Sequence, residues 1–150
     1  MTVLPSFVLK GKSLLPIVQG GMGVGVSAHR LAGAVARLGG VGTLSSVDLR
    51  RHHPDLMAAT GKSRDRAAIR QANLVALDRE IRAALAGAQG RGLVAVNVMR
   101  AVSQYAEYVR QSCESGAQRA TSTSSWRKRE RLGRSSTVAR RSAAFERARA

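Results

Sequence analysis

The chain has 150 residues, of which 44% are hydrophobic and 3% aromatic, and its formal net charge is +16. This length and hydrophobic content predict one globular domain, whose core must consist mainly of Ala, Val, Leu and Gly residues. The single cysteine, Cys113, excludes a disulfide within the chain and suits a reducing compartment. Because no basic start with a long apolar run precedes Leu14, and no segment approaches a membrane span, we expect a cytoplasmic protein.

The charge is unevenly distributed along the chain. Residues 1–118 contain 15 Lys and Arg against 7 Asp and Glu, whereas residues 119–150 contain 10 against 2. The net charge is therefore +8 in each part, although the second part is much shorter. We expect a folded unit over 1–118 and a basic, low-complexity tail over 119–150, for which a solvated, unstructured segment is the simplest interpretation.

The first part of the chain predicts a small hairpin followed by a strand–helix–strand unit. Within this unit, glycines without Cβ atoms let a ligand come close to the main chain, and Ser27 stands where a helix N-cap belongs. The amides of the helix start would then face the glycines, so a phosphate is the expected ligand. In chain order the segments are a hairpin within 1–13, a strand over 14–18, a glycine-rich turn over 20–25, a helix after Ser27 and a strand over 41–44.

The next part predicts two helices around a buried strand. The strand is apolar on both faces, as buried parallel strands are. Asn97 interrupts it near its carboxyl end, where α/β folds bind ligands, so this amide either satisfies neighbouring backbone groups or contacts a ligand. In chain order the segments are a polar loop over 45–54, a helix over 64–85, a strand over 93–98 and a helix over 103–113.

Part of the glycine-rich turn fits a dinucleotide fingerprint. Gly23, Gly25 and Ala28 satisfy the G-x-G-x-x-A form, and Asp48 lies about twenty residues on, as a ribose-binding acid would. Asp48 nevertheless falls several residues beyond the predicted strand, and the fingerprint leaves residues 19–22 unexplained. A Rossmann-type NAD(P)-binding fragment is therefore one alternative.

A broader similarity extends from about Leu14 to Gln118. It consists of Gln-Gly-Gly-Met after the first strand, a small-residue helix, Gly-Gly-Val-Gly before the second strand and Val-Asn-Val-Met in the third. This combination resembles the start of the nitronate monooxygenase family, also called 2-nitropropane dioxygenases, whose relatives include the flavin-type enoyl-acyl-carrier-protein reductases.

The resemblance implies an α/β fold, the N-terminal fragment of an FMN-type TIM (β/α) barrel, over 1–118. FMN would lie across the carboxyl ends of the strands. Gly20, Gly21 and Met22 would line the flavin through backbone and thioether contacts, Asn97 would hydrogen-bond the cofactor, and Ser45 is a further candidate. The implied activity is oxidation of an alkyl nitronate with molecular oxygen, in which the flavin carries the chemistry and the protein positions it.

The resemblance assigns no catalytic residue in this chain. The family's catalytic histidine and its main phosphate-binding glycines lie in later strands, and the histidines here do not occupy that motif. We also expect no metal site at His52 and His53, because neighbouring side chains point in different directions and no Cys or carboxylate stands at ligand spacing.

A complete barrel of this kind has eight strands and about 250 residues, whereas three strands are predicted here before the composition changes. In the family an Asp-initiated, Val/Ile-rich fourth strand follows Ala117. If Arg119–Trp126 use GC-rich codons such as CGC GCG ACG TCG ACG TCG TCG TGG, reading from the third base gives Asp-Val-Asp-Val-Val-Val after one residue. We therefore hypothesise a frameshift near Gln118.

Nucleic-acid binding is the alternative interpretation of the tail. Arg127–Arg131, Arg140 and Arg141 would neutralise phosphates, and Trp126 would stack on a base. No aromatic platform or recognised binding module accompanies these residues, and basic segments bind polyanions without selectivity.

Overall fold

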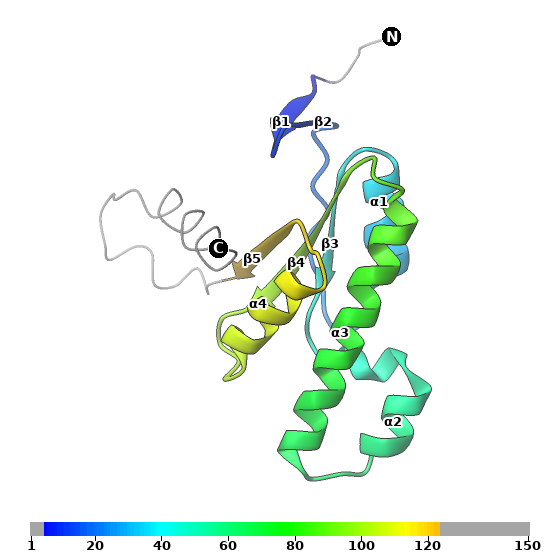
Figure 1. Ribbon diagram of the computed structural model, residues 1–150, viewed down its shortest axis with the longest axis vertical. Coiled ribbons are helices and arrows are strands. Elements are labelled where there is room, and N and C mark those ends of the chain that lie inside the picture. The colour runs from blue at the N-terminus through cyan, green and yellow to red at the C-terminus, as the bar shows by residue number, and fades with distance from the viewer. Residues whose placement is uncertain (1–4, 124–150) are drawn as a thin grey trace, which may run out of the picture.

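The protein is a mixed α/β structure with two small sheets (Figure 1), seen in a computed structural model that describes residues 5–123. Among these residues, no helix has both the length and the apolar character needed to cross a membrane. The elements are β1 (Phe7–Leu9), β2 (Lys12–Leu14), α1 (His29–Arg37), β3 (Val41–Ser45), the 3-10 helix η1 (Leu49–His52), α2 (Pro54–Thr60), α3 (Arg66–Ala88), β4 (Leu93–Met99), α4 (Tyr105–Glu114) and β5 (Arg119–Thr123).

The larger sheet is parallel, and its strand order β3-β4-β5 follows the chain order. Val41 pairs with Leu93, and Ala95 pairs with Arg119. On the other side of β3, Val18 forms an isolated parallel bridge with Val41. Each strand of this sheet thus lies beside the strand that precedes it in the chain, and each connection between them contains a helix.

The main hydrophobic core lies between the sheet and helices α1, α3 and α4. Leu44, Val94 and Val96 face this core from the strands, and Leu77 and Ile81 face it from α3, all with no more than 2% of their surface exposed. Helix α1 approaches β3 so closely that a Cβ on Gly42 would lie 1.8 Å from the carbonyl oxygen of Ala32. A glycine is therefore required at this contact.

The opposite face of the sheet is covered differently at its two ends. Near the strand starts, the β1–β2 hairpin packs Phe7 and Leu9 against a second apolar cluster of Leu14, Val41, Leu93 and Ala95. Figure 1 shows this hairpin at the end of the molecule remote from α2. Toward the carboxyl ends of the strands, the glycine-rich loop between Val18 and α1 lies over the same face.

Most predicted elements are confirmed by the structure. The hairpin is present, and β3, α3, β4 and α4 correspond to the segments predicted from hydrophobic spacing. The strand predicted over 14–18 is wrong. Leu14 ends β2, and only Val18 bridges to β3, because Pro16 has no N–H for a strand ladder. The loop predicted over 45–54 is also wrong, since it contains η1 and the start of α2, where Pro54 occupies the first helical turn.

Residues 119–123 pair with β4 in parallel register as strand β5, so the segment expected to be a tail begins with a strand. The described strands form an open sheet rather than a closed barrel. The frameshift near Gln118 stays a prediction. The basic residues proposed for nucleic-acid contacts, Trp126 among them, lie outside the described residues.

Candidate functional site

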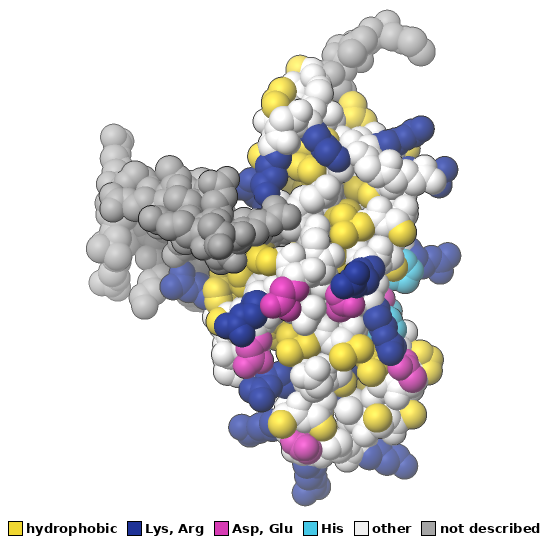
Figure 2. Space-filling model, viewed as in Figure 1, with side chains coloured by type: hydrophobic (Ala, Val, Ile, Leu, Met, Phe, Trp, Pro, Cys, Tyr) yellow, Lys and Arg dark blue, Asp and Glu magenta, His cyan; other side chains and the backbone are white. Residues whose placement is uncertain are grey.

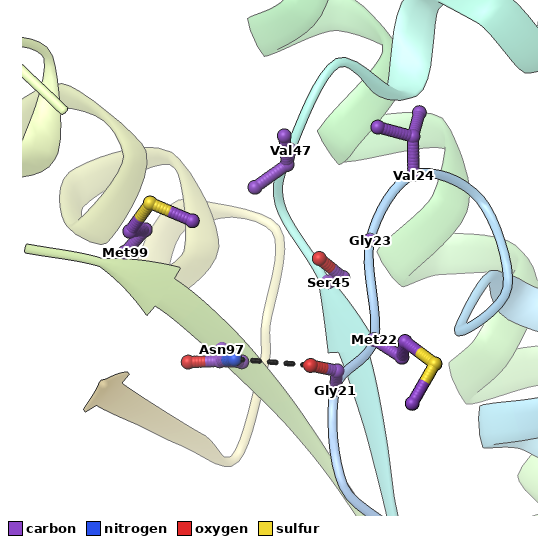
Figure 3. Close-up of a pocket in the computed structure, with 8 residues that line it drawn as sticks. All are labelled: Gly21, Met22, Gly23, Val24, Ser45, Val47, Asn97 and Met99. Carbon is purple, nitrogen blue, oxygen red and sulfur yellow. Dashed lines mark hydrogen bonds between the residues drawn. The ribbon is translucent and has the colours of Figure 1, made fainter. Parts of the chain in front are cut away.

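An open pocket of about 390 Å³ lies at the carboxyl ends of β3 and β4, under the glycine-rich loop (Figure 3). This volume is at the low end of the range for ligand pockets, which is about 300–1,000 Å³. The side chains are mainly apolar, with two polar groups among them. The lining residues are Gly21, Met22, Gly23, Val24, Ser45, Val47, Asn97 and Met99.

Asn97 connects the sheet to the loop. Its Nδ2 donates a hydrogen bond to the carbonyl oxygen of Gly21 at 3.1 Å, drawn as the dashed line in Figure 3. A Cβ on Gly21 would lie 2.6 Å from the Cβ of Asn97, whereas a Cβ on Gly20 would meet nothing within 4 Å. The glycine at position 21 is therefore required for close packing of the loop on the sheet, before any ligand is considered.

Gln19 holds the loop from its other side. Its Oε1 accepts a hydrogen bond from the Thr43 amide at 2.9 Å, and its Nε2 donates to the Thr43 carbonyl at 3.2 Å. The side-chain amide thus takes the place of a strand peptide beside β3. The same Nε2 also donates to Ser27 Oγ at 2.9 Å and to the Gly20 carbonyl.

Ser27 organises the loop instead of capping the helix, so the predicted N-cap role is wrong. The Ser27 side chain is 1% exposed, its Oγ donates to the Gly20 carbonyl at 3.1 Å and accepts from the Met22 amide at 2.9 Å. Ala28 is the N-cap residue, and no side chain in that position caps α1. Ser27 is unable to cap because its hydroxyl is already engaged within the loop.

A buried acid occupies the start of α1. Glu80 of α3 is 2% exposed, and its Oε2 accepts from the His29 backbone amide at 2.7 Å and lies 2.8 Å from His29 Nδ1. Its Oε1 lies 3.3 Å from His53 Nε2. The structure gives no support to a phosphate at this helix start, because the Glu80 carboxylate already accepts the hydrogen bond of the His29 amide and would repel a second anion.

Asp48 does not line the pocket, and its carboxylate is engaged by neighbouring side chains. It lies 2.9 Å from Arg50 Nε and also pairs with Arg51, while Asn73 Nδ2 donates to it at 3.5 Å. Burial would raise the pKa of Asp48, but hydrogen bonds and charges from Arg51 and Arg50 lower it below its ordinary value. The ribose contact expected of Asp48 in a dinucleotide fingerprint has no support in this arrangement.

The histidines lie away from the pocket lining. His29 and His53 contact Glu80, and a Cβ on Gly25 would lie 1.6 Å from His52 Nε2, which places that ring against the loop backbone. Within residues 5–123, no three or more His, Cys, Asp or Glu side chains are grouped so that they could hold a metal ion.

Four of the five residues predicted to contact a cofactor come together in the pocket: Gly21, Met22, Ser45 and Asn97. Gly20 lies next to it, with its carbonyl bound to Ser27. In Figure 3 the Met22 side chain extends to the other side of the loop from Asn97, so its backbone faces the sheet more directly than its thioether does. The sequence analysis missed Val24, Val47 and Met99 as lining residues.

Figure 2 shows Lys and Arg side chains scattered over the visible face, with acidic side chains between them. Several Arg residues are paired with carboxylates, including Arg79 with Asp55 at 2.8 Å and Arg82 with Asp78 at 2.9 Å. On the visible face the Lys and Arg side chains are thus dispersed among acidic ones, whereas a defined nucleic-acid surface gathers positive charge in one patch.

No protein-family model matches the chain, and no curated protein matches it in a sequence comparison.

Proposed function

We propose that the chain is an FMN-dependent oxidoreductase of the nitronate monooxygenase type, and that its larger sheet is one wall of a (β/α) barrel. The observation that carries this proposal is the pocket itself. Four residues assigned to FMN by the resemblance, from three separate segments of the chain, line one cavity at the carboxyl ends of parallel strands. This is where α/β folds bind their ligands.

The residues in the pocket fit an isoalloxazine ring. Val24, Val47 and Met99 supply apolar surface for a planar aromatic group, and Met99 is 41% exposed. Ser45 and Asn97 supply the few polar groups that fix orientation in such sites.

When bound, FMN would supply the redox chemistry of the proposed reaction, in which an alkyl nitronate is oxidised with molecular oxygen. The chain's own residues bind and orient the ring. The apolar side chains exclude water from one of its sides, and Asn97 holds the loop and the sheet together around it. None of the pocket residues is a base that titrates near neutral pH, so this wall contributes binding and orientation rather than proton transfer.

The strand order supports a barrel wall over a dinucleotide-binding sheet. Counting the Val18 segment, which bridges to β3, as the first strand, β5 is the fourth strand and lies beside the third, β4. In a Rossmann sheet the fourth strand lies beside the first. The buried Glu80 carboxylate at the start of α1 is a second argument, because a Rossmann fold binds the pyrophosphate at that position.

The proposal is tested by titrating the purified chain with FMN and, separately, with NAD⁺, while flavin fluorescence and the melting temperature are measured. We expect FMN fluorescence to be quenched and Tm to rise with FMN only, since a ligand that binds the native state stabilises it. Oxygen consumption with an alkyl nitronate then tests the activity. Stabilisation by NAD⁺ without any effect of FMN would overturn the proposal.

A further inference from the structure

The backbone that pairs with β3 through Val18 leaves the sheet just before the pocket, and the side chain of Gln19 continues the hydrogen bonding to β3. Val41 donates its amide hydrogen bond to the Ile17 carbonyl at 2.9 Å, and Gln19 donates its own to the Val41 carbonyl at 2.9 Å. The next hydrogen bonds along β3, at Thr43, are made by the Gln19 side chain instead of a backbone peptide. The backbone is thereby released to turn over the sheet as the glycine-rich loop.

We propose that Gln19 is the positioning residue of the pocket, and that its amide fixes the loop backbone in the conformation that a planar ligand requires. This inference rests on the proposed function, because it concerns the same site. Gln19 does not line the pocket and acts through Ser27.

The contacts form a short chain from the sheet to the pocket. Gln19 Nε2 donates to Ser27 Oγ at 2.9 Å, and the same Oγ holds the carbonyl of Gly20 and the amide of Met22. These two groups flank Gly21, whose carbonyl accepts from Asn97. The backbone at the pocket is therefore held on three sides, by Ser27 before and after Gly21 and by Asn97 at Gly21 itself.

This arrangement predicts an effect on ligand affinity beyond the effect on stability. Without the Gln19 amide, Ser27 loses a donor and the Thr43 backbone groups lose their partner, so the loop samples other conformations. A ligand must then order the loop when it binds, and the affinity falls by the cost of that ordering.

The chain provides a matched control in Gln118. Its Oε1 accepts a hydrogen bond from the Val94 amide at 2.7 Å, so it also joins a glutamine side chain to a strand backbone. It lies near the start of β4, remote from the carboxyl ends that form the pocket. Gln118→Met and Gln19→Met therefore remove the same kind of bond, one far from the pocket and one beside it.

The test compares wild type, Q19M and Q118M by amide hydrogen exchange without ligand and by FMN titration. We expect faster exchange of the Met22 amide in Q19M only. We also expect about a tenfold weaker FMN Kd in Q19M, equivalent to about 1.4 kcal/mol, and less than about a twofold change in Q118M. If Q19M does not fold, Ser27→Ala replaces it, because it removes the loop bonds and leaves the Gln19–Thr43 pairing.

Unchanged Met22 exchange in the Gln19 and Ser27 variants, or equal losses of affinity in Q19M and Q118M, would overturn the inference. If the wild-type chain binds no FMN, the proposed function fails, while the exchange measurement still decides the role of Gln19 in the loop.

Discussion

Asn97 and Gly21 are 76 positions apart in the sequence and are joined by a hydrogen bond of 3.1 Å from the Asn97 Nδ2 to the Gly21 carbonyl. This bond closes the loop onto the sheet and places two residues of the predicted flavin site against each other. Gly21 lies in the loop before α1, and Asn97 lies in β4, which pairs in parallel with β3.

Replacing Asn97 by Ala removes this contact and is expected to weaken FMN binding about tenfold, with a loss of about 1 kcal/mol in the free energy of unfolding. Fluorescence titration and denaturant unfolding measure the two effects. Asn73→Ala is the control, because Asn73 is a buried asparagine outside the pocket whose side chain also bonds to the backbone, accepting from the Arg50 amide at 3.2 Å. It should lose stability and keep its affinity for FMN. Equal affinities in N97A and wild type would contradict the assignment.

Substitutions at the two adjacent glycines should behave differently. A Cβ at Gly21 would lie 2.6 Å from Asn97 Cβ, so Gly21→Ala must displace the loop and should cost about 1–3 kcal/mol. The Cβ that Gly20→Ala adds would meet nothing within 4 Å, so this substitution should change the free energy of unfolding by no more than about 0.5 kcal/mol. Chemical denaturation of both variants tests this. Two equal losses would mean that the loop does not lie on the sheet as described.

Glu80 is expected to stabilise the junction of α1 and α3. Glu80→Ala leaves the backbone amide and the ring of His29 without their buried acceptor and should cost about 3 kcal/mol, whereas Glu80→Gln keeps an acceptor and should cost less. Glu114→Ala, at an exposed position at the end of α4, serves as the control. If E80A unfolds at the same denaturant concentration as wild type, Glu80 does not cap α1.

The acid side of the stability profile should depend on Asp48. The pKa of Asp48 is lower in the folded protein than its ordinary value, which is near 4. The ionised carboxylate therefore adds to the free energy of unfolding above about pH 4, and this stabilisation is lost as the pH falls through the folded-state pKa. Asp48→Asn should therefore cost about 1–2 kcal/mol at neutral pH and progressively less below about pH 4. Asn also tolerates the left-handed backbone at this position, where φ is 48°.

Urea unfolding as a function of pH measures this difference. Asp55→Asn is the comparison, because the pKa of Asp55 is also lowered, by its hydrogen bond from Arg79, but its carboxylate is exposed and screened by solvent. A constant difference between wild type and D48N from neutral pH down to pH 2 would contradict the assignment.

The sequence predicted the elements that have clear hydrophobic spacing, and through a resemblance it indicated four of the residues that line the pocket. It could not predict the interactions made between distant segments. The helix start at α1 shows this, since a local rule assigned the cap to Ser27, whereas Glu80 provides it from another helix. Strand β5 is a second example. The residues after Arg119 have no pattern of apolar side chains, and they form a strand by pairing with the edge of β4.

Gln19 is the clearest omission of the sequence analysis. Gln19 belongs to the Gln-Gly-Gly-Met segment, which the dinucleotide fingerprint leaves unexplained. Its place in that segment was the one sign in the sequence that it has a role in the loop. A single glutamine side chain that hydrogen-bonds to a strand in place of a backbone peptide produces no repeating pattern in the sequence. Its role became visible only when the distances to Thr43 and Ser27 were known.

The most direct test of the central claim is NMR spectroscopy of the four methionine methyl groups during an FMN titration. Met22 and Met99 line the pocket, whereas Met57 lies in α2 beside Arg50 and is the internal control. Ring currents of an isoalloxazine in the pocket should shift the Met99 methyl signal and leave the Met57 signal unchanged, whereas the Met22 thioether extends away from Asn97 and should respond less. An unshifted Met99 signal at saturating FMN would show that the flavin does not bind between the glycine-rich loop and the ends of β3 and β4.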